Sequence, residues 1–199
     1  MSLLFETIRV KDGTFINLAY HSARLNRSRG ALFGSKETID LALEVSIPPD
    51  IPPGVVRCRV DYGSTIERVE FTPYQRRRIM SLTIVESNTI TYDHKFTDRS
   101  EIEALRRGIT TDDIVIVKNG HITDTSFSNI VFHDGIRWLT PSTPLLYGTA
   151  RERLLSDHSI IEEEIRFTDL RHFKKAALIN AMIDLDEAEE IPMDAIVKR

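Results

Sequence analysis

The sequence has one cysteine, little net charge and no long apolar run, and each shortage excludes a class of protein. Cys58, as the lone thiol, excludes an intrachain disulfide framework and fits a reducing compartment, so we expect a cytoplasmic protein. A formal net charge of −4 gives no electrostatic basis for a nucleic-acid partner. No apolar run approaches the length of a transmembrane helix, and residues 1–4 are too few for a signal peptide, so we expect no membrane partner.

The rest of the composition is that of an ordinary globular protein. Hydrophobic residues make up 41% of the chain and charged residues 28%, which leaves enough apolar side chains for a packed core. A length of 199 residues suits one sizeable core or two small lobes. Composition therefore does not separate enzymes from binding proteins, and the function has to be inferred from local motifs.

A series of strands and turns is predicted in the middle of the chain. The run of residues 115–118 begins with three apolar, β-branched residues, and Asn119-Gly120 is a strong hairpin signal. A second apolar run at residues 130–132 ends at the turn signal Asp134-Gly135. After the first hairpin, Asp124 is the one acid in a predicted loop that is rich in hydroxyl side chains.

The segment from Gly148 to Arg151 is predicted to open an amphipathic helix. The small residues Gly148, Thr149 and Ala150 lead into a helical run that carries Leu154 and Leu155. Backbone N–H groups at the start of a helix have no partner within the helix, and the helix dipole is positive there. This turn is therefore a candidate anion site.

A strand, a hairpin and a helix are predicted near the start of the chain. Residues 5–10 alternate as a strand and end at the turn signal Asp12-Gly13. A helix is expected over residues 19–33, with Gly34 as its stop and with leucines at seven-residue spacing as its buried stripe. Those leucines are Leu18, Leu25 and Leu32. Two arginines of this helix, Arg27 and Arg29, are expected to be solvated.

The ordered motifs of the middle stretch resemble those of the class IV pyridoxal-phosphate (PLP) enzymes. These are the branched-chain and D-amino-acid aminotransferases and aminodeoxychorismate lyase. The matching pieces, in chain order, are Asp124-Thr125-Ser126-Phe127-Ser128-Asn129, Asp134-Gly135, Thr140-Pro141 and Leu146-Tyr147-Gly148-Thr149-Ala150-Arg151. A β-meander followed by a helix is the alternative interpretation, but it requires no such order of motifs. The resemblance implies an α/β (α+β) protein with the two-lobed, D-amino-acid aminotransferase-like fold of this family.

The resemblance implies roles for two basic residues outside the middle stretch. His21-Ser22-Ala23-Arg24-Leu25 is similar to the family's His-x-x-Arg-Leu, in which the arginine grips the cofactor phosphate. The preceding Phe5-Glu6-Thr7 is similar to the family's Phe-Glu-Thr. For Arg24 an ion pair is the alternative, and His21 is expected to be structural. Lys95 precedes a predicted helix and matches the family's Schiff-base lysine, although from this segment alone it would be read as an exposed lysine.

The remaining site residues are also implied by the resemblance. Asp124 would pair with the pyridine nitrogen of pyridoxal 5'-phosphate. The N–H groups of the Gly148, Thr149 and Ala150 turn would bind its phosphate, and Asn180-Ala181 would complete the phosphate cup. Asp93, His94 and Asp98 could suggest a metal site, but no second cluster has ligand spacing, so we expect no metal.

The domain boundary and the oligomeric state are expected from the family as well. The resemblance implies a small α/β lobe over residues 1–87 and a larger lobe over residues 88–199 that carries most of the cofactor site. The chain reads as a short form that lacks the family's usual N-terminal leader. A homodimer is implied, because the site borders a dimer interface in the family.

The leading hypothesis is a PLP-dependent aminotransferase that uses a Lys95 Schiff base to move an amino group between an amino acid and a 2-oxo acid. One alternative is elimination of pyruvate, as in aminodeoxychorismate lyase. Another is a non-catalytic relative that binds PLP or a phosphate ligand. Several arginines are open either as partners of a substrate carboxylate or, equally, as surface charges: Arg9, Arg57, Arg59 and Arg99.

Overall fold

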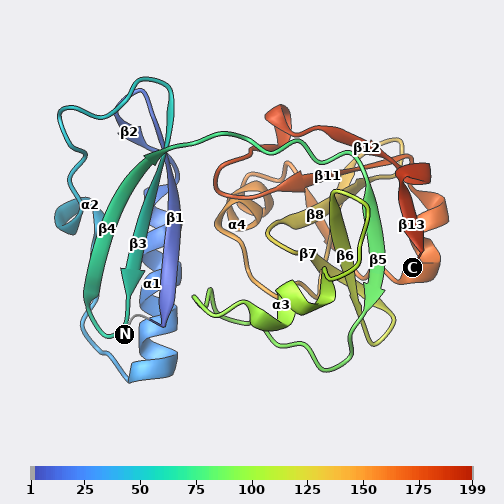
Figure 1. Ribbon diagram of the computed structural model, residues 1–199, viewed down its shortest axis with the longest axis horizontal. Helices are drawn as coiled ribbons and strands as arrows, with labels where there is room; N and C mark the ends of the chain where they lie inside the picture. Colours follow the sequence, from blue (N-terminus) through green and yellow to red (C-terminus); the bar gives the residue numbers. More distant parts are fainter. Residues whose placement is uncertain (1–2, 199) are drawn as a thin grey trace. The chain divides into compact units, whose positions relative to one another are not determined.

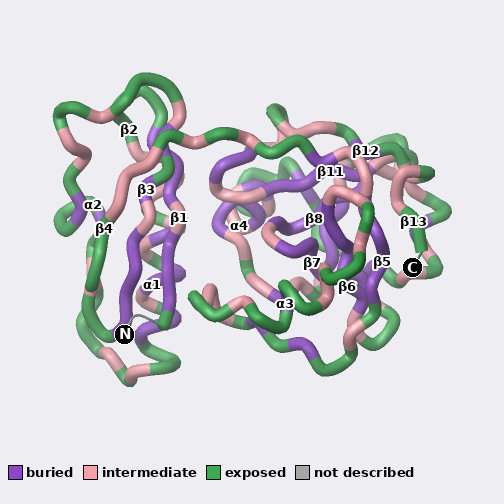
Figure 2. Tube along the Cα trace, in the orientation of Figure 1, coloured by how far each residue is buried: buried purple, intermediate pink, exposed green. Residues whose placement is uncertain are grey.

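The computed structural model describes residues 3–198 and divides into two compact units (Figure 1). Unit 1 consists of the chain up to Arg76 together with His94–Asp98. Unit 2 consists of Arg77–Asp93 together with the chain from Arg99 onward. Each unit has its own buried core, and the buried residues follow β1 and β3 in unit 1 and β6 to β8 in unit 2 (Figure 2).

Unit 1 is an antiparallel sheet with one long helix. Its strands follow the order β2-β1-β3-β4, and the hairpin turn between β1 and β2 has positive φ at Asp12 (49°) and Gly13 (73°). These values are typical of the tight hairpin that the sequence predicted there. The elements of the unit are β1 (Leu4–Lys11), β2 (Thr14–Phe15), α1 (Leu18–Phe33), α2 (Leu41–Glu44), β3 (Val55–Tyr62) and β4 (Ile66–Pro73).

Helix α1 ends where the sequence predicted, but its buried face is largely polar. Gly34 caps it with a φ of 65°, in the left-handed region that favours glycine. Of the predicted leucine stripe, Leu25 is fully buried, whereas Leu32 is 40% exposed. The other buried side chains of the helix are His21, Arg24, Ser28 and Arg29. The predicted stripe was therefore wrong at its C-terminal end, because this helix packs with polar groups that find partners in the unit.

Arg29 is buried and not solvated as expected. Its Nε donates to the carbonyl of Ser64 at 2.8 Å, and its Nη1 donates to Asn26 Oδ1 and to the carbonyl of Glu37. A guanidinium can be buried when its donors are satisfied in this way. Arg29 thus ties α1 to the β3–β4 turn and to the segment before α2, whereas Arg27 is exposed as predicted.

Unit 2 is built on a mixed sheet with the strand order β10-β9-β8-β7-β6-β5-β13, and β11 extends it by pairing with β8 and β12. Its core collects side chains such as Ile122, Ile130 and Phe132 from the middle strands. The strands are β5 (Leu82–Glu86), β6 (Asp113–Lys118), β7 (His121–Thr125), β8 (Asn129–His133), β9 (Trp138–Pro141), β10 (Ile161–Glu163), β11 (Lys175–Ile179), β12 (Glu190–Pro192) and β13 (Ile196–Lys198). The helices are α3 (Ser100–Leu105), α4 (Thr149–Ser156) and the short 3-10 turns η1 (Phe167–His172), η2 (Leu185–Glu187) and η3 (Met193–Ala195).

The division into units differs from the boundary at residue 88 that the sequence suggested. Strand β5 was expected to close the first lobe, but it pairs in parallel with β6 and belongs to unit 2. The segment His94–Asp98 returns to unit 1, where Phe5 N donates to the Lys95 carbonyl at 3.0 Å and Thr97 N donates to the Leu3 carbonyl at 2.9 Å. Backbone pairing between distant segments decides this division, and local sequence does not carry that information.

Asp124 lies on a strand and not in the loop that the sequence predicted. The Asn119-Gly120 turn has φ values of 52° and 79°, which confirms the predicted hairpin between β6 and β7. The return strand β7 continues through Thr125, and Asp124 pairs with Asn129 of β8. A run of hydroxyl residues is therefore part of a buried strand, because its polar groups find partners inside the sheet.

In the part of the chain that is described, no helix is long and apolar enough to cross a membrane.

Candidate active site

The carboxylate of Asp124 is the centre of a buried polar cluster in unit 2. Its Oδ1 accepts a hydrogen bond from Asn129 Nδ2 at 2.7 Å, and its Oδ2 accepts one from the backbone N–H of Leu146 at 2.9 Å. Asp124 is 5% exposed. Each carboxylate oxygen has two lone pairs, so these bonds leave Asp124 with the capacity to accept from a further donor.

Burial makes Asp124 a weaker acid than usual. Desolvation raises its pKa to about 6, against the lowering effect of the bonds from Leu146 and Asn129 and of the Arg151 charge. Since this pKa exceeds the unfolded value of 3.8, ionising the folded protein is unfavourable, and folding stability falls as the pH rises from about 4 to about 6. A cation next to Asp124 would favour its ionised form and so offset the unfavourable effect of burial. A protonated pyridine nitrogen would be such a cation.

The start of α4 lies close to the same cluster. Gly148 immediately precedes the helix, and a Cβ at Gly148 would lie only 1.9 Å from Asn129 Oδ1. Asn129 Nδ2 also donates to the carbonyl of Leu146 at 2.9 Å. The first residues of α4, Thr149 and Ala150, are buried. The turn predicted from sequence to bind an anion is therefore held against Asp124 through Asn129.

Arg151, the last residue of the Gly-x-x-Arg motif, anchors α4 to the sheet. It is 2% exposed, and its Nη2 donates to the Pro141 carbonyl at 2.8 Å and to Glu162 Oε2 at 2.7 Å. These partners lie on β9 and β10, so the arginine fixes the helix start against two strands. Its charge also favours the ionised form of Asp124.

Asn180 lies at the end of β11, as the predicted strand-to-loop turn requires. Its backbone forms two hydrogen bonds with Ile183, and its Oδ1 accepts from Met182 N at 2.8 Å. Its Nδ2 donates to Ser128 Oγ, also at 2.8 Å. Asn180 and Ala181 thus form a tight turn that is joined to the β7–β8 connection, which directly follows the strand that carries Asp124.

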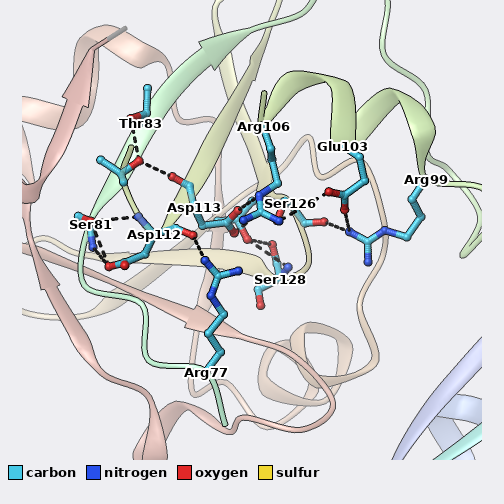
Figure 3. Close-up of polar contacts among 12 residues, drawn as sticks. Arg77, Ser81, Thr83, Arg99, Glu103, Arg106, Asp112, Asp113, Ser126 and Ser128 are labelled. Atoms are coloured by element: carbon cyan, nitrogen blue, oxygen red, sulfur yellow. Dashed lines mark hydrogen bonds and ion pairs between the residues drawn. The ribbon is translucent and has the colours of Figure 1, made fainter. Parts of the chain in front are cut away.

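The β7–β8 connection is clamped at Ser126 by charged side chains (Figure 3). The N–H of Ser126 donates to Asp113 Oδ2 at 3.3 Å, and its carbonyl accepts from Arg99 Nη2 at 2.5 Å. Arg106 Nε lies 3.3 Å from Asp113 Oδ1 as an ion pair. Burial raises the pKa of Asp113. The backbone N–H and the carbonyl of Ser126 are therefore both fixed, by groups on β6 and beside α3.

In unit 1, Arg24 forms a buried ion pair with Glu6 of β1. Arg24 Nε donates to Glu6 Oε1 at 2.9 Å, and Arg24 Nη2 donates to Glu6 Oε2 at 2.5 Å. His21 Nδ1 lies 2.7 Å from the same Oε2. The alternative of an ion pair for Arg24 is thus observed, but in the interior and not on the surface.

The Glu6 carboxylate is held ionised by its partners. Burial alone would raise its pKa, but the charge of Arg24 and the hydrogen bonds from His21 and Arg24 outweigh it and lower the pKa to about 2. Burial also lowers the pKa of His21. Glu6 is therefore an anion at neutral pH, and it orients the Arg24 guanidinium.

Lys95 lies in the segment that returns to unit 1, and its side chain is half-buried. Its carbonyl is bonded to the N–H of Phe5, and its Nζ lies 4.7 Å from the centre of the Phe5 ring. The Arg59 guanidinium lies 4.1 Å from the centre of the same ring. The amine is therefore positioned by an aromatic side chain of β1, with a second cation on that ring.

The predicted site residues are divided between the units. Lys95 and Arg24 both adjoin β1 in unit 1, next to Phe5 and Glu6 respectively. The others form the Asp124 cluster and the turns joined to it in unit 2: Asp124, Gly148, Thr149, Ala150, Asn180 and Ala181. That all of these residues contact the same cofactor stays a prediction. Within residues 3–198, no group of three or more potential ligand side chains could hold a metal ion.

Sequence reasoning did not assign a role to Glu6 or to Asn129. Both lie inside matched motifs, Phe-Glu-Thr and Ser-Asn, and Glu6 also interrupts an otherwise apolar strand face. An acid at such a position requires a buried partner. That signal could have identified Glu6, whereas the contact of Asn129 with the Leu146 carbonyl depends on the return of the Leu146 loop.

Comparisons with known proteins show which family the chain resembles. A family model described as class IV amino-transferase matches residues 64–190. An uncharacterized protein of Haemophilus influenzae is 36% identical over 183 residues, which are 90% of this chain and 97% of that protein. A Schizosaccharomyces pombe protein, provisionally named aminodeoxychorismate lyase, is 26% identical over 90% of this chain and 86% of its own. A crystal structure from Haemophilus somnus, provisionally named 4-amino-4-deoxychorismate lyase, is 33% identical, with a TM-score of 0.84 over 93% of this chain and 98% of that one.

Glu6 makes the stability of unit 1 depend on pH. Its folded pKa of about 2 lies below the unfolded value of 4.5, so the stabilisation is complete above about pH 5 and is lost as the pH falls towards 2. The shift corresponds to about 3 kcal/mol. We expect the difference in unfolding free energy between wild type and Glu6→Gln to shrink by roughly this amount between pH 6 and pH 2. Urea unfolding across this range measures it, with exposed Glu44→Gln as the control; a difference that does not vary with pH would contradict the ion-pair assignment.

Proposed function

The chain belongs to the class IV aminotransferase family, and we propose that it is a PLP-dependent enzyme that transfers an amino group between an amino acid and a 2-oxo acid. The family and fold expected from the sequence are thereby confirmed. The observation that carries the proposal is the buried Asp124 carboxylate, held next to the start of α4 by Asn129 and Leu146.

The residues present suit PLP by their chemistry. Asp124 is a buried acid with spare acceptor capacity, and a protonated ring nitrogen is the kind of donor that would hold it ionised. The turn at Gly148 has no Cβ and opens an α-helix, which suits a phosphate group. Arg24 adds a planar, permanently charged donor group whose orientation is fixed by Glu6.

PLP, when bound, supplies the electron sink for the electrons released at the substrate's α-carbon. The protein's own groups would act on protons and on charge. The Lys95 amine would hold the cofactor and, once released from it, carry the proton of the α-carbon. Asp124 would keep a proton on the ring nitrogen, and Arg24 with the N–H groups of Thr149 and Ala150 would bind the phosphate.

Elimination is the second candidate, and one observation favours it. The Haemophilus somnus structure and the S. pombe protein both carry aminodeoxychorismate lyase in their provisional names. That reaction would release pyruvate from aminodeoxychorismate and leave an aminobenzoate. It would use the same lysine and the same acid, so substrate assays have to separate the two reactions.

The homodimer that the family resemblance implies stays a prediction.

Paired assays decide between the two reactions. We expect the PLP-loaded protein to form a new amino acid when it is given an amino acid and a 2-oxo acid. In a parallel assay with aminodeoxychorismate, release of pyruvate and aminobenzoate is measured. Pyruvate release without amino transfer would replace the proposed reaction by the second candidate. Absence of both reactions, together with tight PLP binding, would point to a non-catalytic relative.

Lys95 is expected to form the covalent link to PLP. Adding PLP to the wild-type protein should give a visible absorption band that borohydride removes, and mass spectrometry should then find the cofactor on the peptide that contains residue 95. Lys95→Ala should lose both signals, whereas the exposed lysine variant Lys36→Ala should keep them. Retention of the label in Lys95→Ala would show that another lysine forms the link.

We expect Asp124 to affect the turnover rate more than the binding of PLP. Asp124→Asn keeps the side-chain shape but removes the charge that would hold the ring-nitrogen proton. A preorganised group of this kind typically contributes about 10²–10³ in kcat. We expect a loss of that order with PLP still attached through Lys95, measured by turnover and absorption. Exposed Asp186→Asn is the matched control, and unchanged turnover in Asp124→Asn would disprove the assigned role.

A further inference from the structure

The Asp124 carboxylate and the start of α4 lie on different parts of the chain, and the Asn129 side chain contacts both. Its Nδ2 donates to Asp124 Oδ1 at 2.7 Å and to the carbonyl of Leu146 at 2.9 Å. The N–H of Leu146 returns to Asp124 Oδ2 at 2.9 Å. Three residues thus form a closed set of hydrogen bonds, and any displacement of one changes the other two.

Position 148 requires glycine because of the space available there and not because of the backbone conformation. Its φ of −72° and ψ of 143° are open to any residue. A Cβ there, however, would lie 1.9 Å from Asn129 Oδ1 and 3.1 Å from its Cγ. A side chain at position 148 is therefore excluded by Asn129 itself.

Asn129 has little freedom to move away. It is 6% exposed, and its backbone is paired on one side with Asp124 of β7 and on the other with Ile179 of β11. Both N–H groups of its amide are engaged by the acid and by the Leu146 carbonyl. The amide is needed as a donor, because an aspartate here would place a second carboxylate next to Asp124.

We infer that Asn129 is a positioning residue that sets the spacing between the Asp124 carboxylate and the first turn of α4, and that Gly148 has no side chain so that Asn129 can do so. The inference rests on the proposed function for its consequence, since these two places would meet two ends of one cofactor, its ring nitrogen and its phosphate group. A change at Asn129 would then alter the fit of both ends together. A merely structural asparagine would stabilise the unit without acting on Asp124.

A double-mutant cycle tests the contact between Asn129 and Gly148. The variants are Asn129→Ala, Gly148→Ala and the double variant, and the measurements are thermal unfolding and PLP affinity by absorbance titration of the apoprotein. We expect each single variant to weaken PLP binding at least tenfold. The PLP affinity of the double variant should be at most about threefold lower than that of the weaker-binding single variant. The reason is that the methyl group introduced at position 148 enters the space that the asparagine side chain vacated. Losses that multiply in the double variant would overturn the inference.

A second measurement separates positioning from general support. The Asn129 donor favours ionised Asp124, so Asn129→Ala should raise the pKa of Asp124 above about 6, measured by carbon NMR of labelled aspartate in the apoprotein. Asn26→Ala is the matched control, because Asn26 Nδ2 also donates two hydrogen bonds, to the carbonyls of Ser22 and Ile39, and does not contact Asp124. It should lower stability and leave the Asp124 pKa unchanged. An unchanged Asp124 pKa in Asn129→Ala would remove the positioning role.

The outcomes remain distinct from those for the proposed function. If the wild-type protein binds no PLP, the proposed function fails, while the unfolding cycle and the Asp124 pKa still decide the role of Asn129. If Asn129→Ala does not fold, Asn129→Ser replaces it in both measurements. Coupled losses with a raised Asp124 pKa support the inference, and independent losses with an unmoved pKa refute it.

Discussion

The candidate site depends on keeping one carboxylate inside the protein. Removing Asp124 from water disfavours its charge, and its pKa accordingly rises to about 6. The hydrogen bonds from Asn129 and Leu146 limit this rise and at the same time fix where the carboxylate lies. Asn129 of β8 and Leu146 of the loop before α4 contact this carboxylate, and Gly148 at the helix start lies against Asn129.

Unit 1 contains a buried acid with the opposite behaviour, and the comparison explains both. Glu6 is buried like Asp124, yet its pKa falls to about 2 because Arg24 donates two hydrogen bonds to it and carries a positive charge. Among residues 3–198, the groups that donate hydrogen bonds to Asp124 are neutral, and the arginine that acts on it is more distant. Glu6 is thus fixed as an anion, whereas Asp124 can respond to a cation that arrives beside it. The first suits a positioning role and the second suits a role in chemistry.

Short-range features were predicted well from the sequence. The Asp12-Gly13 and Asn119-Gly120 turns and the helix stop at Gly34 were all predicted, since each depends on the backbone freedom of one or two residues. The ordered motifs around Asp124 identified the family because they stand in a fixed order along the chain. Predictions failed where contact partners decide the outcome, as for the exposed Leu32 and the buried Arg29.

The sequence by itself determined the family, the turns and the residue types at the candidate site. Only the tertiary structure decided that β5 belongs to unit 2, that His94–Asp98 returns to unit 1, and that Asn129 fills the space beside Gly148. Each of these depends on hydrogen bonds or packing between segments far apart along the chain. Local propensity describes what one segment favours alone, and such contacts appear only when the chain has closed upon itself.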